Sequence, residues 1–347
     1  MESGGQIKSD KLMLSSNSKS HIISMHDISK AELENIFKQS DEMRLANPGK
    51  INQLLQGKKV GLLFFQPSTR TRFSFESAML NLGGNVLGFS DSKTTRAGDY
   101  FNESIEDTIR VISQMVDCIV IRHFECGSAK RAAFVSTIPI INGGDGSNEH
   151  PTQALLDLWI MKNSISGLNN KTIGLIGDPS TRVLRSMIIG LTRFKIKKIL
   201  FLLPPNTPIP EEINFLLTSS HITYEYYDDV CDILRDADAI EILPINLPNL
   251  NSQEESGSSK NLVTPTKYRI TRQKIKKIGK NVPILHPGPR LDELAKDVDD
   301  LPQILYFEQV RLSIFMRMAL LHRLIRGNKN TIYTDNLNKS IKLIETN

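Results

Sequence analysis

The sequence is poor in cysteine and has no long apolar run, and each absence excludes a class of protein. Its 347 residues include three cysteines, Cys118, Cys126 and Cys231. They are too few and too widely spaced for a disulfide framework, and no Cys-x-x-Cys pair offers a zinc or redox motif. No stretch approaches the ~18 uninterrupted apolar residues of a membrane span. We therefore expect no membrane role and a reducing, cytoplasmic environment.

The excess of one sign of charge over the other is also small. Lys and Arg number 43 against 38 Asp and Glu, a net charge of +5. The basic runs at 195–198 and 274–277 are short and predict solvated helix or loop edges, so no nucleic-acid partner is expected. Histidines and acidic residues do not cluster at metal-ligand spacing, which excludes a metal hydrolase. Residues 1–20 lack the apolar core of a secretory signal and predict a disordered leader, with an organelle transit peptide as the alternative.

The remaining composition is that of an ordinary globular protein, with 39% hydrophobic and 23% charged residues. A chain of this length predicts two domains. Short apolar runs alternate with helix-length segments, the pattern of βα units around parallel sheets. Strands are expected at 21–25, 59–65, 86–89, 118–121, 138–141, 172–177, 198–203, 239–243 and 282–285, and helices from Ser29 to about Met43 and at 73–82, 152–165 and 309–325.

This alternation predicts an α/β fold of two doubly wound parallel-sheet domains, residues 21–150 and 151–305, followed by a helix at 306–326 and a polar tail at 327–347. The polar segment 250–260 is expected to be a mobile loop. In open parallel sheets, ligands bind beyond the carboxyl ends of the strands. Functional residues are therefore expected in the loops that follow strands.

The strongest motif runs from Phe64 to Glu76, Phe-Phe-Gln-Pro-Ser-Thr-Arg-Thr-Arg-Phe-Ser-Phe-Glu. An apolar strand ends there, and hydroxyl side chains interleave two arginines where a helix begins. A helix N-terminus presents unpaired N–H groups and partial positive charge. Together with an Arg fork and the hydroxyls, it forms a site for a phosphate dianion. A Ser-Thr pair alone would indicate only a helix cap. The residues expected at the phosphate are Ser68, Thr69, Arg70 and Thr71.

Three further segments carry polar groups at strand ends. In Gly146–Asp157, His150 and Gln153 are three residues apart at a helix start, so both can face one pocket. An imidazole and a carboxamide there can hydrogen-bond a carbonyl and its amide. Arg122 ends an apolar strand and can reach the same sheet edge. The Pro-Gly-Pro loop in His286–Arg290 fixes backbone carbonyls that can accept bonds from an amine or amide.

Taken together, these four segments resemble the aspartate/ornithine transcarbamoylase family, over nearly all of residues 21–326. The His-Pro-Thr-Gln, Ala-Leu-Leu-Asp-Leu and His-Pro-Gly-Pro-Arg segments are similar to the catalytic chains of its aspartate branch. The resemblance implies carbamoyl transfer from carbamoyl phosphate to the amino group of L-aspartate, the second step of pyrimidine synthesis. It implies no metal or organic cofactor.

The resemblance also implies roles for individual residues. Ser68, Thr69, Arg70 and Thr71 would hold the phosphate, and Arg122, His150 and Gln153 the carbamoyl group. Gly288 and Pro289 would add backbone contacts, and Arg182 would bind the α-carboxylate of the acceptor. Because carbamoyl phosphate is already activated, no covalent nucleophile is needed. The catalytic residues would be Arg70, Thr71, Arg122 and His150, and the last three would stabilise a tetrahedral oxyanion.

For the assembly, the resemblance implies a homotrimer with active sites shared between subunits, two domains joined by a hinge, and a C-terminal helix that packs back on the first domain. A regulatory chain is left open.

Two segments differ from the family pattern. In the family, a loop Lys reaches into the active site of a neighbouring subunit, and here Phe101 stands at that position. Arg96 or Lys93 is the candidate replacement. Residues 241–248 also lack the Arg that binds a second carboxylate in the aspartate branch. Two alternatives therefore stay open, a carbamoyltransferase for another amine and a non-catalytic paralogue.

Overall fold

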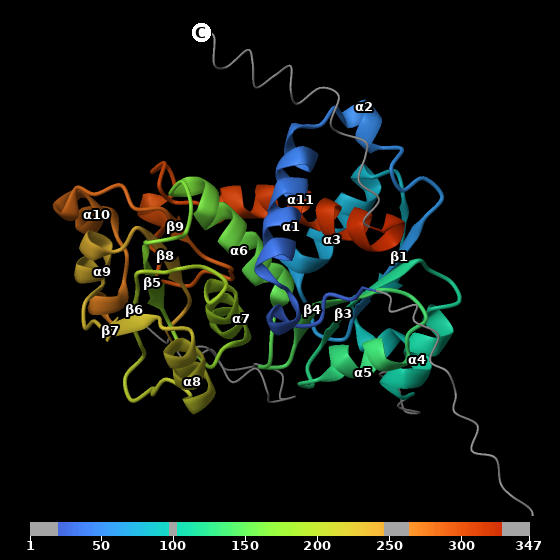
Figure 1. Ribbon diagram of the computed structural model, residues 1–347, viewed down its shortest axis with the longest axis horizontal. Helices are drawn as coiled ribbons and strands as arrows, with labels where there is room; N and C mark the ends of the chain where they lie inside the picture. Colours follow the sequence, from blue (N-terminus) through green and yellow to red (C-terminus); the bar gives the residue numbers. More distant parts are fainter. Residues whose placement is uncertain (1–19, 97–102, 246–263, 328–347) are drawn as a thin grey trace, which may run out of the picture.

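A computed structural model describes residues 20–96, 103–245 and 264–327 of the chain. Two parallel α/β domains lie side by side, and two helices pass between them (Figure 1). The predicted fold class is therefore confirmed. Part of the sequence prediction falls outside the described residues, namely the leader, the loop at 250–260, most of the polar tail, and Phe101.

The first domain contains a four-stranded sheet in the order β2-β1-β3-β4, in which all strands are parallel. Its central strands are buried because helices cover both faces, which is why the sequence shows continuous apolar runs rather than alternation. The strands are β1 Lys59–Phe64, β2 Asn85–Phe89, β3 Cys118–His123 and β4 Ile140–Asp145. The helices are α1 Lys30–Leu45, α2 Pro48–Ile51, α3 Thr69–Asn81, α4 Ile105–Ile112 and α5 Ser128–Val135.

The second domain contains a five-stranded parallel sheet in the order β7-β6-β5-β8-β9. Strand order reverses beside β5, so the loops after β5 and β8 diverge and leave a crevice at the carboxyl edge. The strands are β5 Thr172–Ile176, β6 Lys198–Leu202, β7 Thr223–Tyr226, β8 Ala239–Ile242 and β9 Ile284–Leu285. The helices are α7 Arg182–Leu191, α8 Glu211–Ser219, α9 Val230–Asp236 and α10 Arg272–Ile278.

Two helices connect the halves. Helix α6, Pro151–Ser164, contacts β4, α7 and α11, and every side chain from Pro151 to Met161 is buried. Helix α11, Tyr306–Arg326, packs against α1, α3 and α6, so the expected return of the C-terminal helix to the first domain is confirmed. Trp159 and the apolar face of α11 belong to one hydrophobic cluster that extends through both halves, while each half also has a separate cluster of its own.

Local sequence explains most element boundaries. The predicted start of the first helix is confirmed by a capping box, in which the Ser29 hydroxyl accepts from the N–H of Glu32 and the Glu32 carboxylate accepts from that of Ser29. The prediction of a strand at 21–25 is wrong. In this segment only Ile22 forms a β-bridge, to Ile141, and a 3₁₀ turn follows at Met25–Asp27. The bond from Met25 N–H to the Glu149 carboxylate, 2.9 Å, favours that turn.

The strand expected at 138–141 is displaced toward the C-terminus. It begins at Ile140, because Pro139 has no N–H to donate to a sheet, and it continues through Gly143 and Gly144 to Asp145. This extension carries the polar end of β4 to the same edge as the ends of β1 and β3.

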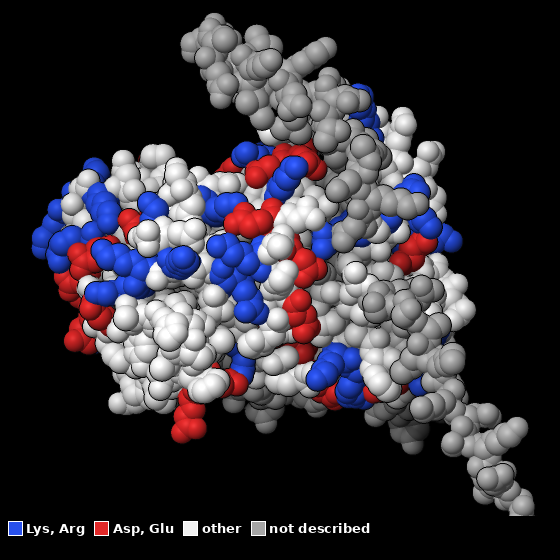
Figure 2. Space-filling model, in the orientation of Figure 1, with Lys and Arg blue, Asp and Glu red and all other residues white. Residues whose placement is uncertain are grey.

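Among the described residues, no helix is long and apolar enough to cross a membrane. On the face in Figure 2, basic side chains at the α9–α10 end are interspersed with acidic ones.

Candidate active site

One cavity of about 290 Å³ lies between the carboxyl edges of the two sheets. All the substrate-binding residues expected from the sequence line it, together with Pro67, Val183 and Pro287. The expected residues are Ser68, Thr69, Arg70, Thr71, Arg122, His150, Gln153, Arg182, Gly288 and Pro289. The fold therefore brings five distant segments together. Lys93 and Arg96 do not line this cavity, and their role at a neighbouring subunit stays a prediction.

Three helices begin at this cavity. Their N-cap residues are Ser68 for α3, His150 for α6 and Thr181 for α7, and none of these side chains caps its own helix. The first-turn N–H groups of α3 and α7 are therefore left for another acceptor, whereas α6 begins with Pro151, which has no N–H, and its Gln153 N–H donates to the His150 carbonyl. Three helix N-termini directed at one space favour a ligand with several negative charges.

Arg70 extends from the start of α3 toward the second domain. Its guanidinium donates a hydrogen bond to the Tyr306 hydroxyl and lies 5.3 Å from the centre of that ring. Gly288 makes room for it, since a Cβ on Gly288 would lie 2.4 Å from the Arg70 Cζ. The backbone of Gly288 also has φ +71°, which favours glycine. Arg70 thus joins the two domains beside the cavity.

Arg122 and Arg182 place two further positive charges at the cavity. Arg122 is buried and donates to the carbonyl of Gly143 at 3.2 Å. Arg182 donates to the Gln66 Oε1 and to the Gly146 carbonyl, both at 2.9 Å. Burial lowers the pKa of both guanidinium groups, and Arg182 lowers that of Arg122 further. The shifts reflect unscreened positive charge that an anion would relieve.

His150 is a neutral imidazole at the inner wall. Burial, followed by the charges of Arg122 and Arg182, lowers its pKa well below the usual range. Its Nε2 lies 3.3 Å from the Thr71 Oγ1, and its backbone N–H donates to the Ser186 hydroxyl at 2.9 Å. A neutral imidazole has one N–H donor, and here it lies beside a hydroxyl that can also donate. The pair can therefore polarise a carbonyl oxygen without carrying charge of its own.

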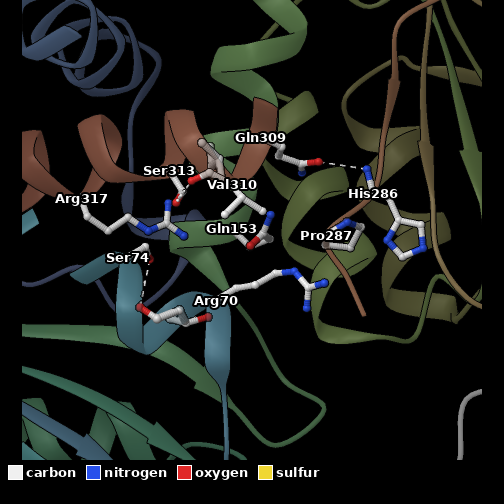
Figure 3. A pocket seen from close by; sticks show the side chains of 11 residues that line it. Arg70, Ser74, Gln153, His286, Pro287, Gln309, Val310, Ser313 and Arg317 are labelled. Atoms are coloured by element: carbon white, nitrogen blue, oxygen red, sulfur yellow. Dashed lines mark hydrogen bonds between the residues drawn. The ribbon is translucent and has the colours of Figure 1, made fainter. Parts of the chain in front are cut away.

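Gln153 lines this cavity and a smaller one of about 20 Å³ behind it (Figure 3). Figure 3 shows Gln153 between α11 and the Arg70 guanidinium, with His286 and Pro287 beyond. The Gln153 Nε2 donates to both carboxylate oxygens of Asp157, at 2.9 and 3.1 Å. The amide oxygen therefore lies on the side away from Asp157.

Several residues around the site were not expected from the sequence. Asp157 follows Gln153 by four residues, a spacing that places both on one helix face and could have revealed the pair. Tyr306 and Gln309 had no such signal, because the strand-end segments that they contact are distant in sequence. Glu241 lies in a strand that was expected, but nothing in the sequence pairs it with Asp157.

The two halves of the chain match two domains of one protein family. Residues 20–163 match the carbamoyl-P binding domain of aspartate/ornithine carbamoyltransferase, and residues 169–324 match its Asp/Orn binding domain. The chain belongs to the aspartate/ornithine carbamoyltransferase family. The family and the enzyme class expected from the sequence, a carbamoyltransferase, are therefore confirmed.

Relatives within this family are similar over most of their length. The aspartate carbamoyltransferase catalytic subunit of Methanocaldococcus jannaschii is 38% identical over 314 residues, 89% of this chain and 99% of that protein. The Clostridium novyi catalytic subunit is 36% identical over 306 residues, 88% of this chain and 97% of that protein.

Solved structures show the same likeness. The M. jannaschii catalytic subunit aligns with a TM-score of 0.78 and 36% identity, covering 90% of this chain and 99% of that chain. Aspartate transcarbamoylase from Trypanosoma cruzi, solved with carbamoyl phosphate and aspartate, aligns with a TM-score of 0.75 and 28% identity. The alignment covers 88% of this chain and 96% of that chain.

Proposed function

We propose that this carbamoyltransferase moves the carbamoyl group of carbamoyl phosphate to the amino group of L-aspartate, giving N-carbamoyl-L-aspartate and phosphate. The observation that carries the proposal is the cavity in which three helix N-termini and three arginines meet. Such a site suits a phosphate next to a carboxylate. The names of the relatives support aspartate as acceptor rather than another amine.

The start of α3 is the proposed phosphate end. Ser68, Thr69 and Thr71 offer hydroxyls, the first-turn N–H groups offer donors, and Arg70 offers a planar fork. The bond from Arg70 to the Tyr306 hydroxyl would be exchanged for bonds to phosphate oxygens. Since a phosphate carries more charge than a phenol, the exchange favours the substrate.

Arg122, His150 and Thr71 form the proposed carbonyl end. Attack of the amine on the carbamoyl carbon develops negative charge on its oxygen, and these three donors are fixed before the reaction begins. His150 stays neutral, so it can hold this oxygen by hydrogen bonding without protonating the incoming amine. Gln153 faces the same space with its amide oxygen, which suits the carbamoyl NH₂ group.

The reaction needs no covalent intermediate between enzyme and substrate. The amine forms the new C–N bond, the C–O bond to phosphate breaks, and the departing phosphate can accept the proton that the amine loses. Arg70 and the α3 N-terminus would balance the charge on that phosphate. The remaining task of the residues is to hold the amine ~3–3.5 Å from the carbonyl carbon.

Arg182 is the proposed partner of the α-carboxylate of aspartate. It lies on the second-domain side of the cavity, at the start of α7. The β-carboxylate would meet the same excess of positive charge, since Arg122 and Arg182 are held by neutral carbonyl and amide oxygens in this structure. No arginine is present in the sequence from 241 to 248.

For the whole protein we propose a cytoplasmic enzyme of pyrimidine biosynthesis that works as a homotrimer with shared sites. Arg96 or Lys93 would enter a neighbouring site, and a regulatory chain is left open. Mixing Arg96→Ala subunits with Arg70→Ala subunits tests the shared site. Hybrid trimers should regain activity, because some sites then combine an intact Arg70 with an intact Arg96. Full activity of Arg96→Ala alone would contradict a catalytic role for this loop residue.

The reaction itself is tested with radiolabelled carbamoyl phosphate and a panel of amines. Labelled carbamoyl aspartate is the expected product. Product only with a different amine would replace the proposed acceptor, and no product with any amine would indicate a non-catalytic paralogue.

A further inference from the structure

Behind the carbamoyl end of the site, two buried carboxyl groups from different elements interact with each other. Asp157 is on α6 and Glu241 is on β8, and both side chains are fully buried. Burial raises the pKa of Asp157 to about 7, and burial together with the neighbouring charge of Asp157 raises the pKa of Glu241 well above its usual range. Two carboxylates so placed cannot both ionise.

The hydrogen bonds around Asp157 favour it over Glu241 as the ionised member of the pair. Gln309 accepts the backbone N–H of His286 on its Oε1 at 3.0 Å, and that N–H can only donate. This fixes the Gln309 amide, so its NH₂ group must donate to the Asp157 Oδ1. The NH₂ group of Gln153 donates to Asp157 as well. A carboxylate that receives two amide donors serves as an acceptor.

Glu241 is in the opposite situation. Within the described part of the chain, neither of its oxygens accepts an N–H or O–H donor. The charged groups facing Asp157 are Glu241 from β8 and Arg317 from α11, and Arg317 donates to the Thr152 carbonyl at 3.0 Å. One cation can balance one carboxylate. A proton on Glu241 would satisfy its own O–H by donating to Asp157, the side chain with which it interacts.

We propose that Asp157 and Glu241 are positioning residues that share one proton and thereby hold the Gln153 carboxamide with its oxygen toward the cavity. In that orientation Gln153 accepts from the NH₂ group of a bound carbamoyl substrate. A turned amide would present its own NH₂ group to that NH₂, which is repulsive. The inference rests on the proposed function, since it concerns the carbamoyl end of that site.

The proposal separates two ligands that a general loss of packing would affect equally. Carbamoyl phosphate has an NH₂ group for Gln153, whereas inorganic phosphate has none. In the full-length enzyme, Asp157→Asn should raise the KM for carbamoyl phosphate about tenfold or more, because Asn cannot accept from both amides. The inhibition constant of inorganic phosphate should stay within about twofold. Parallel weakening of both ligands, or no change in either, would overturn the proposal.

A double-substitution cycle tests whether Asp157 acts through Gln153. If it does, the double variant Asp157→Asn, Gln153→Ala should raise the KM for carbamoyl phosphate no more than Gln153→Ala alone. Additive losses would contradict the proposal. Wild-type turnover is measured alongside, because an inactive wild-type chain would refute the proposed function, whereas an active wild type with additive variants refutes only this inference.

Glu241 provides the test of the shared proton. Glu241→Gln keeps a donor toward Asp157, so the ratio of the affinities for carbamoyl phosphate and inorganic phosphate should stay as in the wild type. In Glu241→Leu this ratio should change. Loss of that donor also raises the pKa of Asp157, so the acid side of the pH profile of kcat/KM should move to higher pH in Glu241→Leu. Equal behaviour of the Gln and Leu variants in the ratio and in the pH profile would overturn the shared proton.

Discussion

Arg70 at the start of α3 donates a hydrogen bond to the hydroxyl of Tyr306 at the start of α11, and its guanidinium lies over that ring. The residue proposed to bind phosphate is thus held in place by the other side of the cleft. Arg70→Ala should remove ~2–4 kcal/mol of transition-state stabilisation, or about two to three decades of turnover. Steady-state kinetics on a folded variant checks this. Unchanged kinetics would contradict the phosphate assignment.

Gly288 tests the same residue from the opposite side. In Gly288→Ala the new Cβ would meet the Arg70 guanidinium, so we expect activity to fall about tenfold or more with the fold retained. Gly279→Ala is the matched control, because Gly279 has φ +70° against +71° for Gly288 and nothing within 4 Å of its Cβ. Both variants share the backbone strain, and only one displaces Arg70. Equal kinetic loss in the two would indicate strain alone.

His150→Ala should lower turnover by about two decades and leave inhibition by phosphate nearly unchanged, because the imidazole lies at the carbonyl end. Since the pKa of His150 is held well below its usual range, the imidazole is neutral at and above neutral pH. Its removal should therefore shift no limb of the pH profile there. Phosphate inhibition that weakens as much as turnover would place His150 at the other end of the substrate.

Glu241→Gln should stabilise the protein, and more so at higher pH. Unfolded Glu241 ionises near its ordinary pKa of about 4.3, whereas in the fold its pKa is raised well above the usual range. Folding therefore takes up a proton, and the associated stability is lost as pH rises from the unfolded pKa toward the folded one. Gln takes up none. Denaturant unfolding at pH 8 should show a gain of at least about 1 kcal/mol that disappears near pH 4. A gain independent of pH would contradict a buried proton on Glu241.

The sequence predicted the fold and most of the cavity lining because both depend on local signals, whereas Arg182 was expected only from the family resemblance. Apolar runs mark strands buried on both faces, and Ser68 and His150 stand where helices follow strands. Parallel strands then bring their carboxyl ends to one edge, so the motif residues meet without any knowledge of long-range contacts.

The sequence could not predict contacts between elements that are distant in the chain. A glutamate in the strand Ala239–Ile242 gives no sign that it faces Asp157, and Tyr306 gives none that it contacts Arg70. The end of β4 was also not predicted, because Gly143 and Gly144 are typical of a loop and yet continue this strand. These details depend on how the two domains pack.

The chain passes between the two domains twice, at α6 and again at α11. A single connection would allow one domain to swivel on the other, whereas two connections joined by a common core resist twisting. We expect the remaining motion to be bending about an axis through both crossings, which would open or narrow the cleft without misaligning its walls. Trp159 is buried in α6 at the first of these crossings, so we expect its packing to affect how the proposed phosphate wall and the proposed amino-acid wall face each other.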